Sequence, residues 1–215
     1  MAMEMSDDDL QQMYQEVILD AARAPHGKEH FLEDTRTQSL RADIDGHVNQ
    51  TSAGDTSVLA EHEACLAAQS HQFNPTCGDE VTIHVEISQQ EPHMVQRVVW
   101  DGQGCSISQA SLSVMVDLVE NQTVERAMKL SDDFHTLMES RGAGIHDESV
   151  EDDLGDAIVF RGVSRYPMRI KCALLGWVGL KASIAQALAN MSDSDSQEGD
   201  FLALQRQSAF SNVKE

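Results

Sequence analysis

Residues 74–107 read NPTCGDEVTIHVEISQQEPHMVQRVVWDGQGCSI, and this stretch decides the fold. From Val81 to Ile87 every second residue is apolar, a pattern typical of a strand with one buried face. A loop at 89–92 separates it from a second β-prone run at 94–100, so the two runs predict an antiparallel pair. The sequence DGQG then ends the second run tightly, and apolar residues recur at helical spacing from Ile107 onward.

The sequence around this pair predicts a small α+β fold. A segment at about 67–72, before the Asn74-Pro75 turn, supplies a third strand. Periodic apolar residues predict helices at about 7–22, 106–118, 123–130, 132–140 and 169–191, with a further marginal helix at 201–210. We therefore expect a small three-stranded antiparallel sheet packed against several helices.

The length predicts one domain. A chain of 215 residues and 23.7 kDa is long enough for a single well-packed core. We assign the domain to residues 7–190, with a polar insertion at about 29–63 and an acidic, polar C-terminal extension at 191–215. The acidic stretch at 147–156 is interpreted as a solvated loop, and neither the insertion nor the extension carries a motif that suggests a role.

The charge balance excludes several classes of partner. The chain has 36 Asp and Glu against 15 Lys and Arg, a formal net charge of -21. Such a surface repels phosphate backbones and anionic lipids, so we expect neither nucleic acid nor a membrane as partner. We find no secretory signal pattern and no apolar run of 18 residues. We therefore expect a cytoplasmic protein, whose reduced cysteines favour metal binding or sulfur chemistry over disulfides.

Three of the four cysteines stand in short motifs that predict a shared site. Cys77 lies in NPTCGDE, Cys105 in GQGCSIS and Cys172 in RIKCALLGW. With Asp79 they offer three thiolates and one carboxylate, the number of ligands that a tetrahedral ion needs. Gly78 permits the dihedral angles of a tight turn between the first two ligands. Cys105 opens a predicted helix, where the positive helix end favours a thiolate.

The neighbours of these cysteines sharpen the hypothesis. Arg169 and Lys171 flank Cys172 and would stabilise an anionic sulfur or hold Asp79 in place. Cys65 stands in no turn motif, and we interpret it as a small buried hydrophobic residue. No histidine pair has the short helical spacing of a metal motif, and the chain has no Walker loop, no dinucleotide fingerprint and no G-x-S-x-G elbow.

The three cysteine motifs, in this order, resemble the IscU/NifU-type iron–sulfur cluster assembly proteins, and in particular their SufU branch. The N-terminal sequence YQEVILDAARAPHGK is similar to the first helix of that family. In IscU-type scaffolds a histidine precedes the third cysteine, whereas Lys171 stands there in this chain. The long stretch around 142–162 is similar to the insertion that marks SufU. Both departures favour the SufU branch.

The resemblance implies a zinc-dependent sulfurtransferase. By that resemblance Cys77, Asp79, Cys105 and Cys172 would bind Zn²⁺, and Cys77 would accept sulfur from the persulfide of a PLP-dependent cysteine desulfurase of the SufS type. Asp79 would be the weakly held ligand, with Arg169 orienting it. By the same resemblance, the protein's partners would be that desulfurase and downstream cluster assembly proteins, while the acceptor of the sulfur stays open.

Two alternatives stay open at this point. The same four ligands would hold a [2Fe–2S] cluster on an assembly scaffold, because soft thiolates bind zinc and iron–sulfur clusters alike. The second alternative is a small interaction module whose zinc is purely structural. Such sites usually contain short Cys-x2-4-Cys knuckles, which this chain lacks.

Overall fold

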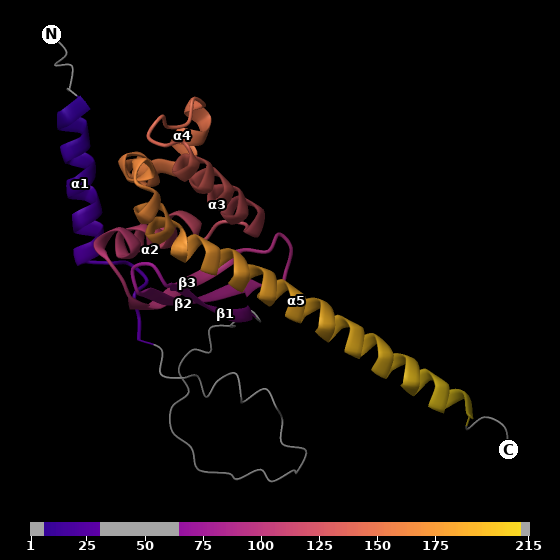
Figure 1. Ribbon diagram of the computed structural model, residues 1–215. Coiled ribbons are helices and arrows are strands. Elements are labelled where there is room, and N and C mark those ends of the chain that lie inside the picture. The colour runs from indigo at the N-terminus through magenta and orange to yellow at the C-terminus, as the bar shows by residue number, and fades with distance from the viewer. Residues whose placement is uncertain (1–6, 31–64, 212–215) are drawn as a thin grey trace, which may run out of the picture.

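The computed structural model describes the backbone of residues 7–30 and 65–211 and the side chains of residues 12–30 and 65–191. The elements follow one another as α1 (Asp7–Arg23), β1 (Cys65–Asn74), β2 (Asp79–Ser88), β3 (Val95–Gln103), α2 (Ser106–Val119), α3 (Val124–Glu139), α4 (Glu148–Leu154), the 3-10 helix η1 (Gly155–Arg165) and α5 (Pro167–Ser211). Figure 1 shows the helices gathered on one side of the sheet. The α+β fold predicted from the sequence is confirmed.

The sheet is antiparallel, in the order β1-β2-β3, and it is covered on one face by α2 and α5 (Figure 1). The alternation that predicted β2 is confirmed, because the four apolar residues Val81, Ile83, Val85 and Ile87 are all buried. Ser183 of α5 donates its hydroxyl to the carbonyl of Ile83 at 3.2 Å. This bond fixes the helix against the central strand.

Helix α5 forms the spine of the core. Trp177, Leu180 and Ile184 are buried along one face, and the ring of Trp177 stacks on Phe134 with centroids 4.7 Å apart. Its segment Pro167–Met191 is long and apolar enough to cross a membrane, by length and composition alone. From the sequence we did not expect an apolar stretch of this kind. More than half of the tested window, 56%, is buried inside the fold, as in the core helix of a soluble protein.

Three expectations for the helices after the sheet were wrong. The segments 123–130 and 132–140 form one helix, α3, because Ser131 is buried in its middle and does not cap a new helix. The acidic stretch at 147–156 contains helix α4, because Leu154 is buried and Asp153 pairs with Arg126 at 2.6 and 2.5 Å. Helix α5 continues to Ser211, past the polar run where we expected it to end.

Helix α1 is only partly buried. Ile18 belongs to the core, but Met13, Val17 and Leu19 remain exposed despite their helical spacing. The apolar stripe of α1 is therefore wider than the surface that the fold covers. The predicted insertion lies outside the described residues, apart from Glu29 and His30.

Candidate metal site

The turn between β1 and β2 positions the first two candidate ligands. The carbonyl of Asn74 accepts hydrogen bonds from the amides of Cys77, at 3.3 Å, and Gly78, at 2.9 Å. The side-chain oxygen of Asn74 accepts a third bond, from the amide of Thr76 at 3.1 Å. Gly78 has φ +76°, a conformation that glycine adopts without strain. The turn thus holds Cys77 at the surface and begins β2 at Asp79.

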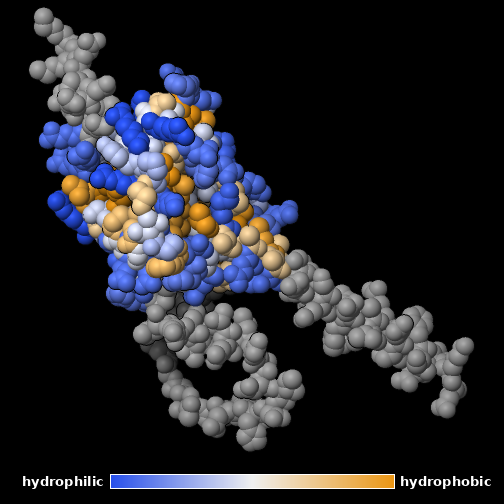
Figure 2. Space-filling view, viewed as in Figure 1, coloured by the Kyte–Doolittle hydropathy of each residue, from blue (hydrophilic) through white to orange (hydrophobic). Residues whose placement is uncertain are grey.

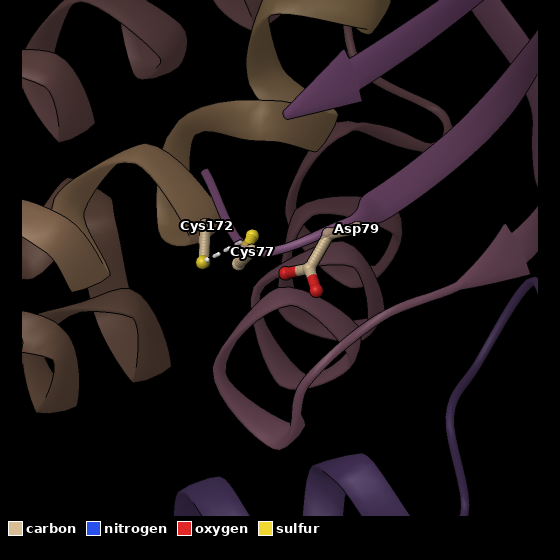
Figure 3. Close-up of side chains that lie close together, drawn as sticks. All are labelled: Cys77, Asp79 and Cys172. Carbon is tan, nitrogen blue, oxygen red and sulfur yellow. Dashed lines mark hydrogen bonds between the residues drawn. The ribbon is translucent and has the colours of Figure 1, made fainter. Parts of the chain in front are cut away.

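Three of the four predicted ligands come together (Figure 3). The side-chain donor atoms of Cys77, Asp79 and Cys172 all lie within 4.8 Å of one another. The two sulfur atoms are 3.3 Å apart. Cys77 comes from the hairpin turn and Cys172 from the first turns of α5, so the group joins the sheet to the core helix.

The two thiols of this group differ in their surroundings. Cys77 is exposed and Cys172 is buried. Burial is the main cause that raises the pKa of the Cys172 thiol, and the neighbouring Cys77, Asp79 and Cys105 raise it further. The Asn74 side-chain amide approaches Cys172 Sγ at 3.7 Å as a donor. Cys172 is therefore a protonated thiol unless a cation replaces its proton.

Asp79 is buried with only one of its oxygens paired. Its Oδ1 accepts the backbone amide of Cys105 at 3.1 Å, whereas its Oδ2 is buried and has no hydrogen-bond partner among the described residues. Gly104 makes this approach possible, because a Cβ atom there would lie 3.2 Å from Asp79 Cγ and 2.9 Å from Ser108 Oγ. An unpaired buried carboxylate oxygen beside two thiols is the arrangement expected of a cation ligand.

Cys105, the fourth predicted ligand, is placed next to this group but outside it. It directly precedes α2, and its side chain is exposed. Its backbone amide, not its sulfur, makes the hydrogen bond with Asp79. Two thiols and a carboxylate, with a third thiol at the rim, match in type and number the donors of a tetrahedral zinc site. The full ligand set remains a prediction.

Two other predictions concern side chains near the site. Arg169 lies with its guanidinium 4.8 Å from the ring centre of Tyr166, and its contact with Asp79 is not among those the structure shows. Its support of Asp79 therefore stays a prediction. Cys65, which we expected to be buried, is exposed, because it begins β1 on the outer face of the sheet and contacts Gln96 at 2.6 Å.

Two positioning residues were missed by sequence reasoning. Asn74 is buried and holds both the turn and the Cys172 sulfur, and the Asn-Pro turn signal was the clue to it. Ser111 of α2 donates to the carbonyl of Ala173 at 2.6 Å and accepts from Trp177 Nε1 at 3.1 Å. This second pair of bonds fixes α5 beside Cys172, and no local sequence signal predicts it.

Comparison with known proteins agrees with these motifs. A family model of the NifU-like N-terminal domain matches residues 52–173, which is more than half of the chain. The chain belongs to this family. This NifU-like protein is 36% identical over 113 residues to the zinc-dependent sulfurtransferase SufU of Bacillus subtilis (strain 168), across 53% of this chain and 71% of that relative.

A second relative is matched over more of its length. The iron–sulfur cluster assembly scaffold protein IscU of Streptococcus pyogenes serotype M1 is 32% identical over 157 residues, across 71% of this chain and 94% of the relative. The family resemblance drawn from the cysteine motifs is thereby confirmed, and both kinds of relative are represented.

Solved structures confirm the fold. A putative iron–sulfur cluster assembly scaffold protein for the SUF system from Fervidobacterium islandicum AW-1 aligns with a TM-score of 0.50 and 27% identity, covering 80% of this chain and 97% of that structure. A nitrogen-fixing NifU-like protein from Brucella abortus aligns with a TM-score of 0.54 at 19% identity, covering 84% and 97%. The second likeness concerns the fold alone.

Proposed function

We propose that this NifU-like protein takes part in iron–sulfur cluster biogenesis as a zinc-dependent sulfurtransferase. In this proposal Cys77 accepts sulfur from the persulfide of a PLP-dependent cysteine desulfurase of the SufS type. One observation carries the proposal: an exposed thiol, Cys77, lies 3.3 Å from a buried one, Cys172, beside a carboxylate with an unpaired oxygen. The exposed member of the pair is the one that a partner protein reaches.

The donors fit a zinc ion. Cys77, Asp79, Cys105 and Cys172 would hold it, and the ion would keep the thiols deprotonated. Burial, with the neighbouring Cys77 and Asp79, raises the pKa of the Cys172 thiol, so this residue serves better as a ligand than as a nucleophile. Cys77 sits on a turn, where a change of side-chain rotamer disturbs no core packing.

The transfer is a thiolate exchange. The Cys77 thiolate attacks the outer sulfur of the partner's persulfide, a bond forms between Cys77 Sγ and that sulfur, and the sulfur–sulfur bond in the partner breaks. The partner's cysteine leaves as a thiolate, and Cys77 carries the persulfide. No net oxidation or reduction accompanies the exchange. We propose Arg169 as a support for Asp79 during this exchange, since it stands three residues before Cys172.

Two features favour this function over a cluster scaffold. Lys171 directly precedes Cys172, where IscU-type scaffolds are expected to carry a histidine. The stretch around 142–162, between α3 and α5, is similar to the insertion that marks SufU, and in this fold it contains α4 and most of η1. The similarity to SufU of B. subtilis supports the same choice.

The scaffold remains the second candidate, because the match to IscU of S. pyogenes spans 94% of that relative. In that role the four ligands would hold a [2Fe–2S] cluster for transfer to downstream cluster assembly proteins. A cytoplasmic location, which we propose because Cys77, Cys105 and Cys172 form no disulfide, would suit either role by keeping the thiols reduced.

The test is an anaerobic purification followed by metal analysis and a desulfurase assay. We expect one zinc per chain, and we expect the protein to raise alanine production by a SufS-type desulfurase. Cys77→Ser should abolish the increase. Cys65→Ser, an exposed cysteine on the outer face of the sheet, is the matched control and should leave it unchanged.

The outcomes separate the candidate functions. Stoichiometric iron and sulfide without any effect on turnover would establish the scaffold instead. Zinc without stimulation would leave a structural metal site. Mass spectrometry of the wild-type protein after turnover should find one added sulfur atom, 32 Da, on the peptide that contains Cys77.

A further inference from the structure

The basic residues of this acidic protein are unevenly placed. Between Ala157 and Ser192 the sequence contains no Asp or Glu, although the whole chain has 36 of them. The same segment carries three arginines and two lysines: Arg161, Arg165, Arg169, Lys171 and Lys181. A local positive charge therefore lies along η1 and the first turns of α5, next to the candidate site.

The arginines of this segment differ in their partners from three arginines elsewhere in the described fold. Arg23, Arg97 and Arg126 each contact a carboxylate. Among the ion pairs of the described residues, none involves Arg161, Arg165 or Arg169. Within the described fold the charges of these three arginines are therefore not paired with a carboxylate, whereas Lys181 of the same segment pairs with Asp132.

These arginines are held by packing instead. Arg161 donates Nε to the carbonyl of Gly142 at 3.0 Å, and the side chain of Arg165 lies against Gly142 so closely that a Cβ there would be 2.5 Å from its Nε. Arg169 stacks over Tyr166. Side chains that are ordered in advance lose less entropy when they bind an anionic group.

Exposed apolar side chains accompany the charge. Tyr166 and Met168 are 52% and 57% exposed. Beside them a cavity of about 670 Å³ runs between α1 and η1, lined by residues that include Leu19, Cys105 and Val163. Figure 2 shows hydrophobic residues gathered on this side of the molecule and bordered by hydrophilic ones. Tyr, Met and Arg are the residue types enriched at protein interfaces.

We propose that this surface, which we call the arginine face and define as Arg161, Arg165, Tyr166, Met168 and Arg169, docks an acidic segment of the sulfur-donating protein. The partner's carboxylates pair with the arginines, and one of its apolar side chains enters the cavity. The face borders the candidate site, because Arg169 lines the same cavity as Cys105. This inference rests on the proposed function for the identity of the partner.

The charge of the whole chain gives the face its specificity. The net charge of -21 makes the protein as a whole repel acidic partners, whereas the unpaired positive charge concentrated at this face attracts them. An acidic partner is therefore oriented by repulsion over most of the surface and by attraction at this face. The same net charge disfavours nucleic acid as the occupant.

The experiment measures binding of the zinc-loaded protein to a SufS-type desulfurase by calorimetry at 50 and 300 mM NaCl. We expect Kd to rise with salt, and Arg165→Gln to raise it about three- to fivefold at low salt. Arg165→Lys keeps the charge and should largely restore the affinity. Lys181→Gln removes the same charge from another part of α5, where Lys181 pairs with Asp132, and should change Kd less than twofold.

Two results would overturn the proposal. One is an equal effect of Arg165→Gln and Lys181→Gln. The other is a loss of self-association in Arg165→Gln, seen by sedimentation, with unchanged affinity for the desulfurase, which would assign the face to contacts between copies of this chain. The binding result stands apart from turnover: arginine-dependent binding without added alanine supports the docking face and overturns the sulfurtransferase. Increased alanine production that the arginine substitutions do not affect would instead support the sulfurtransferase and overturn the docking face.

Discussion

The backbone amide of Cys105 donates to Asp79 Oδ1 at 3.1 Å, so the residue that opens α2 fixes the carboxylate at the start of β2. The bond uses one oxygen and leaves the other, Oδ2, turned into a buried space without a partner among the described residues. Without a bound cation, the unpaired Asp79 Oδ2 lowers the stability of the fold, but it is already in place as a ligand atom.

Asp79→Asn should have opposite effects with and without zinc. In the metal-free protein the change replaces a buried, half-paired carboxylate by a neutral amide, which costs less to bury, and we expect the free energy of unfolding to rise by about 1–3 kcal/mol. With zinc the loss of the anionic ligand should lower the affinity by about 10- to 100-fold or more. Urea unfolding in chelator and a competitive zinc titration measure the two effects. An equal loss of stability in both states would contradict this view of Asp79.

Gly104→Ala should displace the Asp79 carboxylate through steric contact. The added methyl group would lie 2.9 Å from Ser108 Oγ and 3.2 Å from Asp79 Cγ, so we expect a loss of about 1–3 kcal/mol and a weaker zinc site. Gly155→Ala is the control, because its φ of +47° strains the backbone far from the ligands. It should lower stability and leave zinc affinity unchanged. Unchanged zinc affinity in Gly104→Ala would show that Asp79 adapts freely.

Ser111→Ala should loosen the start of α5. The hydroxyl serves both the carbonyl of Ala173 and the indole N–H of Trp177, and its removal leaves the buried indole N–H without this partner. We expect the free energy of unfolding to fall by about 1–3 kcal/mol. Thr136→Ala also removes a hydroxyl that donates to a backbone carbonyl, but at an exposed position. It should change the free energy of unfolding by less than about 0.5 kcal/mol. Thermal unfolding compares the two.

Asp153→Asn should reduce the stability of the fold at neutral pH, and this loss of stability should be smaller in acid. Hydrogen bonds from Arg126, and then from Lys129, lower the pKa of Asp153 below its usual value. The stabilisation is therefore present above the unfolded pKa of about 3.9 and is lost as the pH falls below it. The difference in unfolding midpoint between wild type and Asp153→Asn should narrow from pH 6 to pH 3. A difference that does not depend on pH would mean that the carboxylate acts through packing alone.

Local patterns predicted the sheet and the helix that follows it. Alternation over Val81–Ile87 and the helical spacing after Cys105 depend on one buried face each, and the core supplies that face in both cases. The same reasoning failed at Ser131, where a Ser-Asp-Asp sequence looks like a helix cap. Burial of its neighbours Leu130 and Phe134 on one continuous face explains why the helix does not break.

The errors at α4 and Cys65 depend on distant parts of the chain. The acidic helix is held by an ion pair between Asp153 and Arg126, 27 residues apart in sequence. Cys65 is exposed because the register of β1 against β2 places it on the outer face. Neither contact leaves a signal in the local sequence.

The candidate site was predictable in its residue types but not in its geometry. Turn motifs and a family resemblance identified all four proposed ligands. The sequence did not reveal that Cys172 would be buried and Cys77 exposed, nor that the Asn74 amide would approach a sulfur 98 residues away. This difference in exposure between the two thiols arises only when α5 packs across the sheet.

The contact between Cys77 and Cys172 joins positions 95 residues apart, and the intervening loop contains β2, β3, α2, α3, α4 and η1. Any ion or cluster bound by both sulfur atoms acts on the unfolded chain as a cross-link does, by removing the freedom of that loop. Freeing Cys77 for chemistry opens the cross-link. Each cycle of sulfur acceptance would then remove the stabilisation that this cross-link gives to nearly the whole domain. The bonds from Ser111 of α2 to the carbonyl of Ala173, and from Ser183 of α5 to the carbonyl of Ile83 in β2, help to hold α5 in place meanwhile.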